Sequence, residues 1–210
     1  MDRGGHSRDG GGGTRPVSTP EGEEMDEHKG SDIIRDWPEE SREAAQLVID
    51  AHGEPHEATP SLLNWYGVGP WKRVTASRTF HEHHFPVPHI DSVESSVDYR
   101  VPPERCADLA RFDGSVVVER TAGEVSARCH DEQANFLALN LMHDIVTGLR
   151  SAEQARNYYA KAFLDYRRKE PTPYMDRLQF RPDGNTADPD ERVLSDEDLQ
   201  RAVEEGRRKG

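Results

Sequence analysis

The sequence predicts an α+β fold: an antiparallel sheet of about three to four strands packed against a helical hairpin, with a disordered N-terminal tail and a polar C-terminal tail. Three observations lead to this prediction. Segments in which apolar and polar residues alternate lie in the middle of the chain, between residues 71 and 129. Segments with helical spacing lie on both sides of them. The regular alternation of strands and helices that is typical of a parallel sheet is missing.

Composition divides the 210 residues into one domain and two tails. Residues 1–31 are rich in glycine and carry few apolar side chains, so we expect this segment to be disordered. Residues 32–180 have dense apolar patterning and are numerous enough to build one hydrophobic core. Residues 181–210 are expected to form a polar linker and a short amphipathic helix.

The formal net charge is −13, and the central domain shares in this acidity. An acidic domain repels phosphate backbones, which argues against nucleic-acid binding. No apolar run approaches the ~20 residues that span a bilayer, and the N-terminus lacks the apolar core of a signal peptide. Two cysteines, Cys106 and Cys129, are too few for a disulfide framework. We therefore expect a cytoplasmic protein without membrane or nucleic-acid partners.

The first helix is predicted from Trp37-Pro38-Glu39-Glu40 onward, because a proline and two acids suit the first turn of a helix. Apolar residues at helical spacing follow it, and Gly53 ends the helix. Residues 60–69 are expected to form a short helical turn or a loop, which a glycine-rich stretch then breaks.

Strands are predicted over residues 71–83 and 93–101, followed by a short helix and by a hairpin of residues 115–120 and 125–129. In the first strand Val74, Ala76 and Phe80 share one face. Strict alternation places His81 and His83 on the opposite, polar face.

The most apolar helix is predicted to begin after Asp131 and to end at Gly148, and its wide apolar arc marks it as the central core helix. A capping box that starts at Ser151 begins the next helix, and the short connection between the two helices predicts a hairpin. A last helix is expected after Ser195. Its apolar face is small: Leu199, Ala202 and Val203.

Four of the ten histidines lie within residues 81–89, and this density suggests a metal site. His81 and His83 point the same way with Cα atoms about 6.5–7 Å apart, and His89 can return after the proline-rich connection. Three imidazoles with an open position are typical of hydrolytic zinc enzymes. The ion would be zinc, manganese or iron, with Glu82 or Asp91 as the general base. The alternative is an exposed histidine-rich strand end that binds metal only weakly.

Other groups that could carry chemistry are weaker candidates. His143 and Asp144 are adjacent on a helix and point about 100° apart, so a solvated face is expected. Cys129 and His130 point to opposite faces of a strand, which favours a buried, unreactive thiol. A pocket between the sheet and the helical hairpin is a third option, and four aromatic residues would line it: Trp65, Trp71, Tyr158 and Phe163.

Several stretches resemble a group of bacterial proteins of unknown function. These stretches are residues 64–73, 84–89, 99–103, 111–114 with 118–120, and 126–129 leading into 135–141. The resemblance covers about residues 60–174. It implies no activity, cofactor, partner or site residue.

The sequence thus leaves two functions open. The leading hypothesis is a small binding or interaction protein without its own catalysis, because no catalytic signature is specific and the C-terminal helix suits a protein partner. The alternative is a metal-dependent hydrolytic enzyme that uses His81, His83 and His89.

Overall fold

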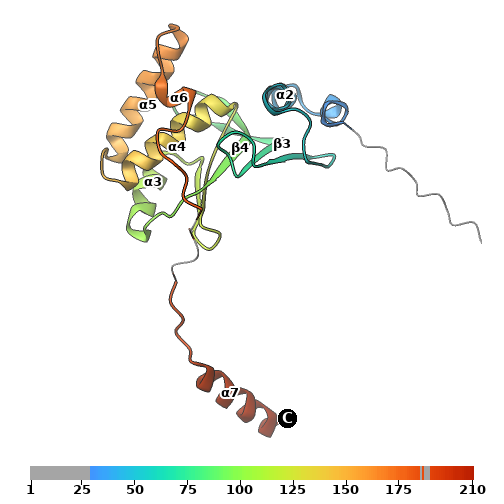
Figure 1. Ribbon diagram of the computed structural model, residues 1–210, viewed down its shortest axis with the longest axis vertical. Coiled ribbons are helices and arrows are strands. Elements are labelled where there is room, and N and C mark those ends of the chain that lie inside the picture. The colour runs from blue at the N-terminus through green and yellow to red at the C-terminus, as the bar shows by residue number, and fades with distance from the viewer. Residues whose placement is uncertain (1–28, 185, 187–189) are drawn as a thin grey trace, which may run out of the picture.

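The computed structural model describes residues 29–184, 186 and 190–210 (Figure 1). Within them one antiparallel sheet of six strands packs against helices, which confirms the α+β class. The expected number of three to four strands was too small. Most of the segment that we expected to be disordered, residues 1–31, lies outside the described residues, and a short helix already begins at Gly30.

The strands are short at the edges of the sheet and long at its centre. They are β1 (Glu57–Ala58), β2 (Leu62–Tyr66), β3 (Arg73–His83), β4 (His89–Asp98), β5 (Val116–Glu119) and β6 (Glu124–Cys129). Their order in the sheet is β1-β2-β3-β4-β6-β5, and all neighbours are antiparallel.

Helices precede, interrupt and follow the strands. They are α1 (Gly30–Ile33), η1 (Ile34–Asp36), α2 (Glu39–His52), η2 (Pro103–Arg105), α3 (Cys106–Phe112), α4 (Glu132–Val146), α5 (Ala152–Arg167), α6 (Pro173–Asp176) and α7 (Asp196–Lys209). The predicted helix ends are confirmed where the sequence contains a capping residue. Gly53 ends α2 at a positive φ of 80°, and the Asp131 carboxylate accepts a hydrogen bond from the Ala134 amide at the start of α4.

Strand β2 replaces the helical turn or loop that was expected over residues 60–69. Leu63 and Trp65 are buried and pair with Ala76 and Val74 of β3. The alternation covers only five residues, and apolar or aromatic side chains also stand at its exposed positions, such as Tyr66. A two-residue period is hard to recognise in so short a segment. Pairing with β3 decides the conformation.

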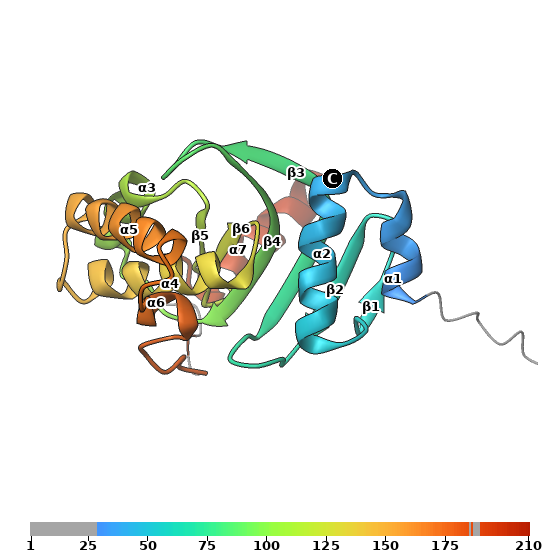
Figure 2. The ribbon, with the colours of Figure 1, turned by 90° about the horizontal axis from the view of Figure 1, so that it is seen from above.

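Helices α2 and α4 lie on the same face of the sheet (Figure 2). The strand register places Val74, Ser95 and Ala127 side by side on that face, and all three are buried. Helix α2 covers the half that contains β3, and α4 covers the half that contains β6. Helix α5 packs on α4 as the expected hairpin.

The two halves meet at the start of α4. Glu132 accepts a hydrogen bond from the indole of Trp71, and its carboxylate lies 2.9 Å from Nε2 of His52 at the end of α2. The Trp71 ring stacks on Phe136 with 4.5 Å between the ring centroids. One carboxylate therefore joins α2, α4 and the turn before β3.

Helix α7 begins after Ser195 as expected, where Ser195 and Asp198 form a capping box, yet all of its described residues remain unburied. Leu199 and Val203 are 49% and 53% exposed. A search of the described residues finds no helix with the length and apolar character needed to cross a bilayer.

Candidate metal centre

An irregularity in β3 decides which way its histidines point. Ala76 pairs with Val93, but the next pair is His81 with Asp91, so β3 advances five residues while β4 advances two. Alternation alone would place His81 opposite Ala76, whereas cross-strand partners share a face. The bulge therefore turns His81 and His83 from the expected polar face to the face of Val93.

The turn between β3 and β4 then brings a second histidine back. His83 pairs with His89, and Asp91 lies two residues further along β4. One ligand atom from each of His83, His89 and Asp91 lies within 4.8 Å of the others. Of the three predicted histidines, the structure thus joins two and adds a carboxylate. His81 is exposed and stands outside the group.

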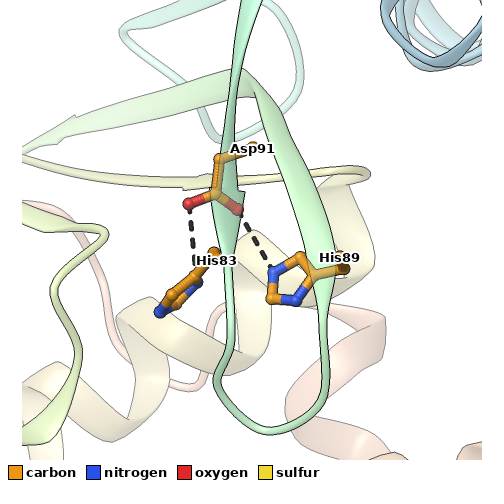
Figure 3. Close-up of side chains that lie close together, drawn as sticks. All are labelled: His83, His89 and Asp91. Atoms are coloured by element: carbon orange, nitrogen blue, oxygen red, sulfur yellow. Dashed lines mark ion pairs between the residues drawn. The ribbon is translucent and has the colours of Figure 1, made fainter.

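The Asp91 carboxylate presents one oxygen to each imidazole (Figure 3). Its Oδ2 lies 3.4 Å from Nδ1 of His83, and its Oδ1 lies 3.2 Å from Nε2 of His89. The centroids of the two rings are 4.9 Å apart. The Asp91 side chain is 5% exposed and the imidazoles are 19% exposed, so the group is largely shielded from solvent.

The far side of the cluster is held by a turn that leads into β5. The Ser115 hydroxyl donates to Oδ2 of Asp91 and lies 3.2 Å from Nδ1 of His83. Asp113 Oδ1 accepts a hydrogen bond from the Ser115 amide at 2.8 Å and lies 3.6 Å from Nε2 of His83. On the other imidazole, Nδ1 of His89 lies 2.8 Å from the Val87 carbonyl oxygen.

Two atoms that face one another in the cluster lack a hydrogen-bond partner among the described residues. Nε2 of His89 and Oδ1 of Asp91 are buried and make no well-directed hydrogen bond to any other described residue. Their 3.2 Å approach to one another is an ion-pair contact whose angles do not suit a hydrogen bond. Buried polar atoms without a partner are uncommon and call for an explanation.

The electrostatics of the site follow from burial and from the Asp91 charge. The Asp91 carboxylate, and next to it the Cys129 thiol, raise the pKa of His89 to about 11, so this imidazole is protonated at neutral pH when no other cation is present. Burial raises the pKa of Asp113, and it also raises the pKa of Cys129. The thiol is thus neutral and buried, in agreement with the unreactive cysteine that the sequence predicts.

Aromatic residues close the site on the side of α5. The Phe85 ring lies 6.4 Å from the His83 ring and 5.0 Å from the Tyr159 ring, measured between centroids. The Arg156 guanidinium stacks on Phe85 at 3.8 Å and donates to the Phe112 carbonyl oxygen. These contacts hold the proline-rich turn between β3 and β4 against the helices.

An open pocket of about 310 Å³ adjoins the cluster. It is lined by His81, Glu82, His83, Asp91, Gly114, Ser115 and Arg128. Glu82, which the sequence suggested as a general base, also lines this pocket, but it pairs with Ile90, so its side chain alternates with those of His81 and His83. The other suggested base, Asp91, belongs to the cluster itself. Asp113 and Ser115 were missed, because nothing in the sequence links a turn near residue 114 to histidines about thirty positions earlier.

The other predicted groups do not form sites. His143 contacts the Tyr99 hydroxyl, and Asp144 pairs with Arg150, so the two neighbours diverge as expected. The expected solvated face was wrong, because Asp144 is buried and His143 is half-buried against Tyr99 and Phe180. The four aromatic residues do not line a common pocket: Trp65 and Trp71 are core residues, Tyr158 stacks under Arg150, and Phe163 stacks under Arg167.

Comparison of this chain with protein-family models, with curated proteins and with solved structures finds no match.

Proposed function

We propose that this protein binds one divalent transition-metal ion through His83, His89 and Asp91 and uses it in a hydrolytic reaction. One observation carries the proposal. Three ligand atoms converge within 4.8 Å, and two polar atoms in this group are buried without a directed hydrogen bond to any described residue. A bound cation would complete both atoms.

The spacing of the group suits a small divalent ion. Two ligands bound at about 2.1 Å in tetrahedral geometry lie about 3.4 Å from one another. Oδ1 of Asp91 and Nε2 of His89 lie 3.2 Å apart, and the ligand atoms of all three residues lie within 4.8 Å of one another. Binding thus requires the His83 ring to move closer to the other two ligands.

The charges of the site favour a cation as well. Asp91 and Asp113 are two carboxylates with side chains only 5% and 4% exposed. Burying carboxylates is costly unless positive charge accompanies them. Two nitrogens and one oxygen are ligands that zinc, manganese and iron(II) accept.

The hydrolytic part of the proposal rests on the open side of the centre. Three protein ligands leave a coordination position for water, and a bound divalent ion lowers the pKa of that water. The pocket beside His83 and Asp91 leaves room for a substrate.

Elemental analysis of tag-free protein tests the proposal. We expect about one zinc, manganese or iron ion per wild-type chain and none in a His83→Ala/His89→Ala variant. His81→Ala is the matched control, because His81 lies on the same strand but outside the cluster. Equal metal in all three proteins, or none in the wild type after incubation with excess Zn²⁺, would contradict the proposal.

A second candidate function rests on the exposure of α7. Its small apolar face, Leu199 with Ala202 and Val203, is exposed along its whole length. We infer that this face docks on a protein partner rather than on nucleic acid, since the chain is strongly acidic.

Deletion of residues 190–210 tests this docking. We expect the deletion to remove a co-purifying protein and to leave the melting temperature of the domain unchanged, because α7 buries none of its described residues. A lower melting temperature would show instead that the helix packs on its own domain.

A further inference from the structure

We propose that the turn Asp113-Gly114-Ser115 is the positioning element of the metal centre, an inference that rests on the proposed metal binding. The turn contributes no ligand. It selects which atom of His83 and which oxygen of Asp91 face the ion. Metal ligands are commonly oriented in this way by an outer layer of hydrogen bonds.

Ser115 acts on Asp91. Its hydroxyl donates to Oδ2, so one carboxylate oxygen is already engaged. The other oxygen, Oδ1, is buried and faces Nε2 of His89. The hydrogen bond thus prevents free rotation of the carboxylate and leaves Oδ1 directed to the ion.

Asp113 acts on His83. Nε2 of this imidazole lies 3.6 Å from Asp113 Oδ1, and a small tilt of the ring on metal binding brings the pair within hydrogen-bond range. A neutral imidazole that donates from Nε2 has its lone pair on Nδ1. Nδ1 is the atom that faces Asp91 at 3.4 Å. Without an ion, Nδ1 also lies 3.2 Å from the Ser115 hydroxyl, which donates to Asp91 and therefore accepts the Nδ1 proton. An ion bound at Nδ1 would displace that proton, and Asp113 would then hold the remaining proton on Nε2.

The second imidazole, His89, is oriented by a backbone carbonyl group instead of a side chain. Nδ1 of His89 is 2.8 Å from the Val87 carbonyl oxygen, which can only accept, so Nδ1 is the protonated nitrogen and Nε2 is left for the ion. Val87 and Ser115 thus engage the outer atoms of His89 and Asp91, whose inner atoms, Nε2 and Oδ1, make no directed hydrogen bond to any described residue.

The turn is itself rigid enough for this role. The Ser115 amide donates to Asp113 Oδ1 at 2.8 Å, so the two positioning side chains are tied to one another. Asp113 is 4% and Ser115 is 9% exposed. The next residue enters β5, which pairs with β6 beside the ligand strand β4. The sheet therefore holds the turn at a constant distance from the ligands.

Zinc affinity measured by competition with a chromophoric chelator tests the inference in the full-length chain. We expect Asp113→Ala and Ser115→Ala to bind one Zn²⁺ each, about 10- to 100-fold more weakly than the wild type. Ser92→Ala is the matched control, because Ser92 is a buried neighbour of Asp91 whose hydroxyl has no described hydrogen-bond partner. Its zinc affinity should equal that of the wild type.

Long-range ¹H–¹⁵N NMR of the zinc-loaded protein supplies a reading that a merely structural role would not change. In the wild type we expect His83 to be bound through Nδ1 and protonated at Nε2, and His89 to show the reverse. In Asp113→Ala the His83 resonances should report a mixture of tautomers. If Asp113→Ala folds poorly, Asp113→Asn takes its place. This variant keeps an acceptor at the same position and should retain the wild-type tautomer.

The outcomes separate the two proposals. Zinc bound by the wild type with unchanged affinity in both turn variants, or His83 bound through Nε2, would overturn the positioning role and leave the metal site intact. A wild type that binds no zinc would overturn both. A loss of affinity in Ser92→Ala as large as in Ser115→Ala would show a packing effect and would also overturn the inference.

Discussion

Glu132 is the side chain whose removal should most clearly separate the two halves of the fold. Its carboxylate accepts from the Trp71 indole and lies 2.9 Å from Nε2 of His52. In Glu132→Ala the Trp71 indole nitrogen, on a residue only 2% exposed, is left without this acceptor. An unsatisfied buried donor costs about 1–3 kcal/mol, and the lost contact with His52 adds about 1 kcal/mol.

We therefore expect Glu132→Ala to lower the free energy of unfolding by about 2–4 kcal/mol, which corresponds to a melting temperature lower by about 4–16 °C for a domain of this size. Urea unfolding followed by circular dichroism at 25 °C measures it. Glu132→Gln keeps an acceptor for the indole and should lose less than half as much.

A double-mutant cycle with Trp71→Phe isolates the hydrogen bond. We expect a coupling free energy of about 1 kcal/mol or more between the two positions. If Glu132→Ala unfolds within about 0.5 kcal/mol of the wild type, or if the cycle shows no coupling, the carboxylate does not join the halves and the reasoning is wrong.

Three further predictions concern the core, the acid stability and the C-terminal segment. Leu139→Ala, at a fully buried position of α4, should cost about 2–5 kcal/mol in urea unfolding; a smaller loss would mean that the site collapses around the gap. Burial lowers the pKa of His143, so the unfolded chain binds the proton more tightly and the free energy of unfolding should fall as the pH drops below about 6.5. His143→Gln should show a shallower fall of this free energy between about pH 7 and 5. An unchanged dependence on pH would contradict this. Gly123 has a φ of +67° and an added Cβ there would overlap the Thr186 carbonyl, so Gly123→Ala should speed proteolysis near residue 186; Gly67→Ala, at a φ of +62° with open space, is the control and should not.

The helices were predictable because their signals are local. The apolar spacing of α4, the capping box of α5 and the glycine after α2 each lie within a few residues of the structure they specify. The β5–β6 hairpin was predictable for the same reason, and its register places Val116 opposite Ala127 and Val118 opposite Val125. Strand β2 was not, since a five-residue strand acquires its conformation from β3.

The candidate site shows the same division more sharply. The sequence pointed to the segment that contains two of the three clustered residues, because four histidines in nine residues are a local signal. It assigned His81, His83 and His89 to one site by strict alternation. The structure brings His83 and His89 together with Asp91 instead, since the bulge opposite β4 changes which face the strand presents.

The amino-acid sequence by itself thus determined the α+β class, the main helices and the neighbourhood of the proposed metal centre. Only the tertiary structure decided the number of six strands, the residues that cluster at the proposed metal centre, and the contacts of Asp113 and Ser115 with them. The physical reason is the range of the interactions. Helix periodicity and capping act over three or four residues, whereas the direction of a strand side chain depends on a partner strand, and the partners of His83 come from positions 91, 113 and 115.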